Sequence, residues 1–336
     1  MGISPVRISL AGGGTDMPEY YEKYGGNVVS STISLFTYLM IKPRNDDSFQ
    51  AFSTDFESHQ SKTSYKQLKA KGGTEIPVSV IKYLNFKSGA DFVIASDVQP
   101  GSGLGGSSSL TVNCINTISK LQKKKLSKKQ VAEKSFFVER NILKHPIGKQ
   151  DDYVASFGGL NYIKFTKNKT TVTPIHLKKS ISEELQNNLL LFFIGTTRKS
   201  STVLSKQLKK TKNLDPITLN SLHKVNDLGK DLFKSLKTSD LTRVGEILDE
   251  GWREKKNFTK QVSNPKIDKI YDNAIKKGAI GGKLTGAGAG GHMLFYCELK
   301  KQKSLKNEMK RLGLKYVDFK FYPHGSKILN LYDFIK

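Results

Sequence analysis

The sequence predicts an α+β protein built in two halves. Strand-like and helix-like segments follow one another in mixed order, a charged stretch near 166–183 separates two groups of them, and 336 residues are enough for two domains. The sequence contains no internal repeat and no long low-complexity tract. We place the division after residue 175, which predicts domains of 1–175 and 176–336.

In the first half, apolar and β-branched runs predict strands, and apolar residues at helical spacing predict helices. Strands are expected at residues 5–10, 27–43, 48–53, 91–98 and 160–165. Helices are expected at residues 76–86, 110–121, 127–143 and 151–157. The charged stretch near 166–183 is expected to be a loop.

In the second half, the continuous apolar run at 188–194 is typical of a buried strand. Several helices are expected between residues 200 and 277, where Pro216 and Pro265 mark interruptions. A strand, a helix and another strand are expected to close the chain. The second half therefore completes an α+β pattern.

The composition favours a cytoplasmic protein. Hydrophobic residues make up 37% of the chain, and no apolar stretch approaches the length of a membrane span. The first residues lead directly into a strand-like segment, without a basic and apolar cleavable leader. The two cysteines, Cys114 and Cys297, are expected to be small buried side chains, without a role in a disulfide framework or a metal site.

The charge balance leaves two classes of function open. Lys and Arg number 55 against 30 Asp and Glu, a formal net charge of +25, and such a surplus is one mark of nucleic-acid binding. The lysines are spread along the chain, and no known basic and aromatic nucleic-acid module is visible. We therefore favour a lysine-rich surface that attracts anionic small molecules, with a nucleic-acid-binding protein as the alternative.

The most informative segment is the glycine- and serine-rich turn at 99–109, QPGSGLGGSSS. It stands between the predicted strand at 91–98 and the predicted helix at 110–121. The first amide groups of a helix have no partner within the helix, and the helix dipole favours an anion at that end. Such a turn is therefore expected to bind phosphate.

Two common phosphate loops do not fit this turn. Gly101, Gly103 and Gly106 match G-x-G-x-x-G, but the acidic residue that a dinucleotide site needs about twenty positions later is missing. A second match at 286–291 is followed by a strand-like segment instead of a helix. A Walker loop needs a lysine after the glycines, and none is present. The serines offer hydroxyls instead, which cap a helix or bind a hard cation such as Mg²⁺.

Three segments in order resemble the motifs of the GHMP kinases, the family of galactokinase and of the homoserine, mevalonate and phosphomevalonate kinases. They are residues 5–21, 100–109 and 283–291. The resemblance implies a ribosomal-protein-S5-like N-terminal domain that binds ATP, a ferredoxin-like C-terminal domain, and Mg²⁺-dependent phosphoryl transfer to an alcohol.

Two further segments narrow the resemblance within the family. Residues 12–16, GGGTD, and residues 148–162 are most similar to kinases of D-glycero-D-manno-heptose 7-phosphate, with fucose-type sugar kinases next. The implied reaction phosphorylates the anomeric hydroxyl to give the 1,7-bisphosphate, a step toward nucleotide-activated heptose. The implied partners are ATP and a sugar phosphate, without nucleic acid or membrane, and the sequence leaves the oligomeric state open.

The resemblance also implies roles for individual residues in ATP and Mg²⁺ binding. Ser107 and Glu139 match the metal ligands of the family. The cradle for the ATP phosphates is expected at Pro100, Gly101, Ser102, Gly103, Leu104, Gly105, Gly106, Ser107 and Ser108.

Asp151 matches the family's catalytic aspartate, either as a base or as an electrostatic stabiliser, and Arg7 matches the basic residue that steadies charge on the transferred group. Asp152 follows directly, but adjacent helical carboxylates point apart, so only Asp151 is expected to face the substrate.

The remaining predicted contacts concern the sugar. Arg198, which follows the strand at 188–194, is expected to bind the distal phosphate of a sugar phosphate. The glycines at 286–291 are expected to bring the backbone close to the ligands. The full set of predicted substrate residues is Gly13, Gly14, Thr15, Asp16, Arg198, Gly286 and Gly288.

Overall fold

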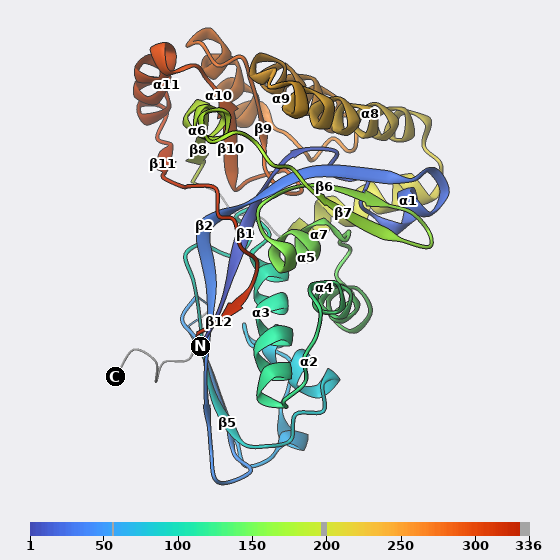
Figure 1. Cartoon of the computed structure of the whole chain (residues 1–336), viewed down its shortest axis with the longest axis vertical. Coiled ribbons are helices and arrows are strands. Elements are labelled where there is room, and N and C mark those ends of the chain that lie inside the picture. The colour runs from blue at the N-terminus through green and yellow to red at the C-terminus, as the bar shows by residue number, and fades with distance from the viewer. Residues whose placement is uncertain (56, 196–199, 330–336) are drawn as a thin grey trace.

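Two sheets organise the chain, one in each half (Figure 1). The structure is a computed structural model, and it describes residues 1–55, 57–195 and 200–329. The first sheet has the strand order β12-β1-β2-β5-β3-β4, with β6 paired to β2 and β7 to β6. Its strands are β1 (Gly2–Ala11), β2 (Gly26–Pro43), β3 (Phe49–Ser53), β4 (Ser58–Lys62), β5 (Ala90–Ser96), β6 (Leu160–Phe165), β7 (Thr170–Pro174) and β12 (Lys327–Ile328).

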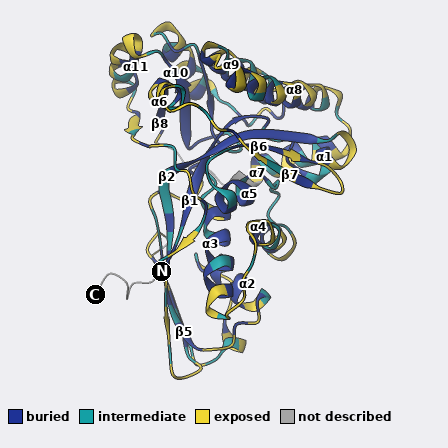
Figure 2. Cartoon of the chain, viewed as in Figure 1, coloured by how far each residue is buried: buried dark blue, intermediate teal, exposed yellow. Residues whose placement is uncertain are grey.

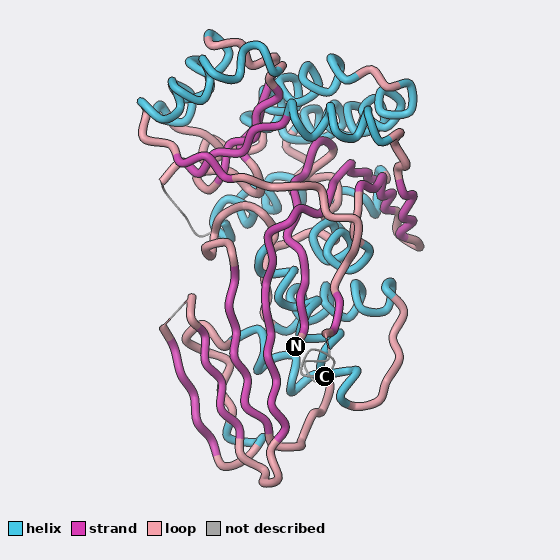
Figure 3. The backbone as a smooth tube through the Cα atoms, turned by 60° about the vertical axis from the view of Figure 1, so that its left-hand side comes forward, coloured by secondary structure: helices cyan, strands magenta, loops and turns pink. Residues whose placement is uncertain are grey.

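The long strand β2 holds the first sheet together. It pairs with β6 through residues 26–31 and with β5 through residues 37–43, while β1 lies along its other edge. The strands run side by side in the lower half of the molecule, with helices against the sheet (Figure 3). The β1–β2 register shifts between Pro5 and Arg7, where proline offers no N–H to the ladder.

Helices cover the first sheet. Helix α3 packs on β1 and β2, and α2 and α4 pack on α3. The helical elements of this half are α1 (Pro18–Tyr24), η1 (Tyr65–Gln67), α2 (Glu75–Tyr83), α3 (Gly106–Leu121), α4 (Lys128–Phe137), η2 (Val138–Ile142) and α5 (Gln150–Phe157). Both η1, a short 3-10 turn, and η2, a π-helical turn, are single turns.

The second sheet is ferredoxin-like, as expected. Its strands in chain order are β8 (Leu189–Phe193), β9 (Gly281–Leu284), β10 (His292–Tyr296) and β11 (Lys315–Val317), and they are arranged β11-β8-β10-β9. The order is therefore fourth, first, third, second, with antiparallel neighbours throughout. The helices of the second half are α6 (Lys179–Asn188), α7 (Ser200–Lys212), α8 (Pro216–Thr238), α9 (Leu241–Lys256), α10 (Pro265–Lys276) and α11 (Leu299–Arg311).

The two halves share a hydrophobic core. Ile8 and Leu10 of β1 are buried with Leu191 of β8 and with Leu232 and Val244 of α8 and α9. The dark blue residues of Figure 2 mark this interior where α8 and α9 lie on the sheets. The C-terminal segment returns to the first sheet, because β12 pairs with β1. The division after residue 175 stays a prediction, and this shared core means that the halves do not pack as independent units.

The structure corrects the expected loop at 166–183. Strand β7 and the start of α6 occupy it, because the β-branched residues of 170–173 pair with the edge of β6. Strand β4 was also missing from the sequence-based assignment, and the expected helix at 127–143 is divided into α4 and η2. Cys114 and Cys297 are buried and unbridged, as predicted. Within the described ranges, no helix is long and apolar enough to span a membrane.

Candidate active site

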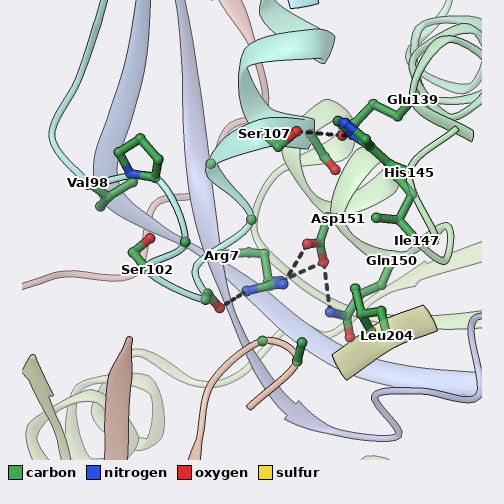
Figure 4. Close-up of a pocket in the computed structure, with 18 of the residues that line it drawn as sticks. Arg7, Val98, Ser102, Ser107, Glu139, His145, Ile147, Gln150, Asp151 and Leu204 are labelled. Carbon is green, nitrogen blue, oxygen red and sulfur yellow. Dashed lines mark hydrogen bonds and ion pairs between the residues drawn. The ribbon is translucent and has the colours of Figure 1, made fainter. Parts of the chain in front are cut away.

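Residues from both halves line a cavity of about 760 Å³. This volume is within the range typical of ligand sites. The first half contributes β1, the loop at 98–108 and the start of α5, and the second half contributes α7, the end of α9 and the third glycine motif. Figure 4 shows Arg7, Ser107 and Asp151 converging from these first-half elements, together with Glu139 of η2.

The glycine turn passes directly over Asp151. Helix α3 begins at Gly106, and its N-cap is Gly105 in the left-handed region at φ 77°. A Cβ at Gly105 would lie 3.1 Å from Asp151 Oδ2, so a side chain here would be both strained and crowded. No side chain caps α3, which leaves its first amide groups open to a ligand.

The third glycine motif packs against the same turn. A Cβ at Gly286 would come within 2.6 Å of Gly103 Cα, so the two backbones touch. His292 Nδ1 donates to the carbonyl oxygen of Ser102 at 2.8 Å. The motif from the second half therefore holds the phosphate turn in place.

Arg7 joins Asp151 to the glycine turn. Its Nε donates to Asp151 Oδ1 at 2.7 Å and its Nη2 to Oδ2 at 2.6 Å, while Nη1 donates to the carbonyl of Gly103 at 2.7 Å. Forked pairs of this kind add geometric specificity to charge-assisted hydrogen bonding. The guanidinium is buried, whereas the Asp151 side chain keeps 24% of its surface exposed. Asp151 is therefore held rigidly at the cavity wall.

Two residues missed in the sequence complete this arrangement. Gln150 Nε2 donates to Asp151 Oδ1 at 3.0 Å, and Ser9 Oγ donates to Gln150 Oε1 at 2.8 Å. Oδ1 therefore accepts two hydrogen bonds, whereas Oδ2 accepts one, from Arg7. Oδ2 is consequently the oxygen with room for a substrate hydroxyl. Both residues lie within segments that the sequence analysis matched to the family, Ser9 in 5–21 and Gln150 in 148–162, but neither was singled out there.

Asp152 faces the interior, as expected from its position beside Asp151. Its side chain is fully buried, and neither carboxyl oxygen has a hydrogen-bond partner. Burial first, and the nearby Glu139 carboxylate second, raise the pKa of Asp152 well above its ordinary value. Asp152 is therefore unsuited to contact the substrate.

Ser107 and Glu139 form an oxygen-rich pair at the start of α3. Ser107 Oγ donates to Glu139 Oε2 at 2.6 Å, and His145 Nδ1 lies 3.5 Å from the same oxygen. Glu139 belongs to η2, and π-helical turns occur frequently at functional sites. The other oxygen, Glu139 Oε1, is buried without a hydrogen-bond partner.

This donor set fits Mg²⁺. Mg²⁺ prefers oxygen ligands and is commonly held by one or two protein groups together with phosphates and water. No cluster of three or more His, Cys, Asp or Glu in the described part of the chain could hold a metal alone. The Ser107 hydroxyl, the Glu139 carboxylate and the adjacent phosphate turn fit a site in which protein, phosphate and water hold Mg²⁺ together.

Most predicted sugar residues of the first motif line the cavity, as Gly13, Gly14 and Asp16 do. Asp16 Oδ1 accepts from the Gly14 amide at 3.0 Å, and its Oδ2 accepts from the Gln150 amide at 3.1 Å. Burial, followed by the charge of Asp151, raises the pKa of Asp16. Asp16 therefore ties the first motif to the start of α5 as well as facing the cavity.

Three predicted site residues lie outside the cavity lining. The Thr15 hydroxyl is buried and contacts the carbonyls of Gly12 and Asn27, so the expected sugar contact does not agree with its position. Leu104 is a core residue, and Gly288 packs against Val262. Arg198 lies outside the described residues. The other predicted residues all line the cavity: Arg7, Gly13, Gly14, Asp16, Pro100, Gly101, Ser102, Gly103, Gly105, Gly106, Ser107, Ser108, Glu139, Asp151 and Gly286.

The second half adds three polar cavity residues that the sequence analysis did not assign to the site, besides apolar ones such as Leu204 and Phe258. Lys255, near the end of α9, and Lys283, in β9, are both buried. Gln207 of α7 is buried, and its Nε2 has no hydrogen-bond partner among the described residues. Only Lys283 lies within a matched motif, 283–291, whereas Lys255 and Gln207 look like ordinary polar residues of lysine-rich helices.

Comparison with known proteins identifies the family. Residues 75–159 match the GHMP kinases N terminal domain, and residues 232–314 match the GHMP kinases C terminal domain. The chain is 34% identical over 330 residues to the D-glycero-alpha-D-manno-heptose 7-phosphate kinase of Campylobacter jejuni, covering 96% of this chain and 97% of that protein. It is 24% identical to the L-fucokinase/L-fucose-1-P guanylyltransferase of Bacteroides fragilis, covering 87% of this chain and 34% of that larger protein.

A solved structure agrees with this assignment. The crystal structure of a D-glycero-D-manno-heptose 1-phosphate kinase from Bacteroides thetaiotaomicron is 26% identical, with a TM-score of 0.82. The alignment covers 98% of this chain and 99% of that one. The chain therefore belongs to the GHMP kinase family and is a sugar kinase, a phosphotransferase whose acceptor is an alcohol group.

Proposed function

We propose that this kinase transfers the terminal phosphoryl group of ATP to the anomeric hydroxyl of D-glycero-D-manno-heptose 7-phosphate, giving the 1,7-bisphosphate. The Arg7–Asp151 pair beneath the phosphate turn is the observation that carries the reaction type. The choice of sugar rests on the relative at 34% identity, whose name specifies the 7-phosphate, and on the segments at 12–16 and 148–162. The structural neighbour named for a heptose 1-phosphate is less similar, at 26% identity.

The proposed chemistry uses residues held at fixed positions. The sugar hydroxyl donates a hydrogen bond to Asp151 Oδ2, the less occupied oxygen of that carboxylate. Its oxygen attacks the terminal phosphorus, the bond to the bridging oxygen breaks, ADP leaves, and Asp151 takes the hydroxyl proton. Arg7 keeps the carboxylate and the phosphate turn in register, because it bonds both at once.

Ser107 and Glu139 are the residues that would hold Mg²⁺. When bound there with ATP, the ion would neutralise charge on the terminal phosphates. The open amides at the start of α3 would bind phosphate oxygens beside it.

Glu139→Gln is expected to weaken Mg²⁺ binding strongly. Loss of a supporting partner alone costs about 10- to 100-fold in metal affinity, so loss of a ligand is expected to raise the Mg²⁺ requirement by about 100-fold. Mg²⁺ is titrated at a fixed nucleotide concentration. Calorimetry measures the affinity for the ion, and steady-state rates measure the Mg²⁺ concentration that activity requires. Glu133→Gln is the matched control, because Glu133 lies on the neighbouring α4 and pairs with Lys149 outside the cavity. An unchanged Mg²⁺ requirement in Glu139→Gln would remove Glu139 from the metal site.

The proposed sugar subsite lies between the first motif and α7. Gly13 and Gly14 line it on one side, and Leu204 and Gln207 on the other. The unpartnered Gln207 Nε2 is a free donor suited to a sugar hydroxyl. Arg198 stays a proposed ligand of the distal phosphate.

A panel of sugars tests the substrate. Heptose 7-phosphate, heptose 1-phosphate, unphosphorylated heptose and fucose are each offered with ATP, and ADP release is coupled to an optical signal. We expect the highest kcat/KM with the 7-phosphate and a product phosphorylated at both ends. Turnover of fucose with none of the 7-phosphate would support a fucokinase-like enzyme and overturn the proposed sugar.

A further inference from the structure

Two buried lysines at the cavity wall have no acidic partner. Lys283 is 7% exposed and Lys255 is 9% exposed, and both line the cavity. Neither makes an ion pair with a carboxylate in the ranges that the structure describes, whereas Arg7 beside them pairs with Asp151. Burying a charge is costly unless it is paired, so two lysines without an acidic partner at one wall favour an anion from outside the chain.

The lysines use only part of their hydrogen-bonding capacity. Lys255 Nζ donates to the carbonyls of Leu284 at 2.9 Å and Gly286 at 2.5 Å, which leaves one of its three N–H groups. Lys283 Nζ has one long contact, 3.4 Å to the carbonyl of Leu10. Lys255 therefore anchors the third glycine motif, and Lys283 is largely uncommitted.

The positions of Lys255, Lys283 and Arg7 indicate which anion they bind. Gly286, which Lys255 holds, packs on Gly103, and Arg7 holds the carbonyl of Gly103. Arg7 and Lys255 thus lie at the junction between the phosphate turn and Asp151, and Lys283 lines the same cavity with its Nζ near the carbonyl of Leu10 in β1. A phosphoryl group that passes from the turn to a hydroxyl at Asp151 must cross this junction. The phosphate already on a heptose 7-phosphate is at the other end of the carbon chain from the anomeric hydroxyl.

We propose that Lys283 and Lys255, together with Arg7, bind the phosphoryl group while it moves from ATP to the sugar. The proposal rests on the proposed function for the position of the hydroxyl, but not for the identity of the sugar. Fixed cations in a site that excludes water act most strongly on charge that develops during the reaction.

The electrostatics of the cavity agree with this proposal. The titratable side chains that line the cavity are Arg7, Asp16, Asp55, Glu75, Glu139, His145, Asp151, Lys255 and Lys283. Burial, and then repulsion from Arg7, lower the pKa of Lys283 to about 8. Burial, and then repulsion from Lys283 and Arg7, lower the pKa of Lys255 well below its ordinary value. A bound anion would raise both values, so binding is expected to take up protons.

Lys283→Met is the first test, because methionine keeps the volume and removes the charge. We expect kcat to fall about 100-fold, the effect typical of removing one electrostatic donor, while nucleotide affinity stays within a few-fold. The melting temperature is expected to stay level or rise, because an unpaired buried charge is lost. Lys255→Met is expected to lower kcat and also to weaken nucleotide binding, since the third motif loses its anchor.

Lys256→Met is the matched control, because Lys256 follows Lys255 on the same helix, is more exposed and pairs with Asp268. Its kcat is expected to equal that of the wild type. If Lys283→Met keeps kcat within threefold, the proposal is overturned. If it instead raises KM for a phosphorylated sugar without changing kcat, Lys283 binds the sugar's own phosphate and the proposal is likewise overturned.

A second measurement needs no sugar. ADP with Mg²⁺ and beryllium fluoride, which imitates the terminal phosphoryl group, is titrated into the protein in buffers of different ionisation enthalpy. Wild type is expected to take up protons, increasingly above about pH 8, and to bind more weakly as pH rises. Lys283→Met is expected to take up fewer protons, and ADP alone to cause little uptake.

The two measurements separate two kinds of failure. Absence of proton uptake by the wild type would overturn the proposed role of the lysines, whichever sugar the enzyme uses. A sugar panel without heptose turnover, combined with normal uptake, would overturn only the proposed substrate.

Discussion

Asp151→Asn is expected to lower kcat about 10³-fold, within the range for a positioned acid–base group. The amide keeps the size of the carboxylate but places an NH₂ group or a weaker acceptor where Oδ2 meets the attacking hydroxyl. Nucleotide affinity is expected to stay close to that of wild type, because the phosphate turn contacts Asp151 only through Arg7 and the close approach of Gly105. Steady-state rates combined with titration of a non-hydrolysable ATP analogue measure both quantities.

Asp152→Asn provides the matched comparison on the next residue of α5. Asp152 lies outside the cavity lining, and burial raises the pKa of its carboxyl, so the uncharged amide of asparagine, which has the same size, is expected to fit the same position. We expect kcat to change by less than about tenfold, a size typical of small structural adjustments. Full activity of Asp151→Asn, or equal losses in the two variants, would contradict the assignment of Asp151 as the group that meets the hydroxyl.

Arg7→Met is expected to lower kcat by about 10³-fold and, unlike Asp151→Asn, to weaken nucleotide binding as well. The two effects have separate causes. Loss of Nε and Nη2 leaves Asp151 without its paired cation, and loss of Nη1 releases the carbonyl of Gly103 in the phosphate turn. Rate and affinity for the same ATP analogue are again the measurements.

Two further arginine variants serve as comparisons for Arg7→Met. Arg7→Lys is expected to recover only part of the rate, because an ammonium cannot form the fork to both carboxylate oxygens while reaching Gly103. Arg243→Met is the control, since Arg243 also bonds several carboxylates, on α8 and α9, but lies outside the cavity. Its kcat is expected to stay near wild type even if its stability falls. Normal kcat and normal nucleotide affinity in Arg7→Met would exclude the proposed role.

Much of the fold was predictable because its signals are local. The apolar runs predicted β2, β5, β6 and β8, and the glycine turn between β5 and α3 predicted a phosphate site. Strand β7 was missed because its short Thr-rich segment, which ends in Pro174, carries no apolar strand pattern of its own and is a strand through its pairing with β6. The threonine of the first motif shows the same limit, because only the folded chain turns the Thr15 hydroxyl toward Asn27.

The sequence by itself determined the family, and it predicted the phosphate turn and the role of Asp151, since a glycine run between a strand and a helix, and motifs in a set order, are properties of the chain. Tertiary structure alone decided that Arg7 grips Asp151 across 144 positions, that Oδ2 is the less occupied oxygen, and that Lys255 and Lys283 meet at the same wall. The physical reason is burial. Whether a lysine is a solvated surface group or an unpaired charge depends on what the distant parts of the chain pack around it.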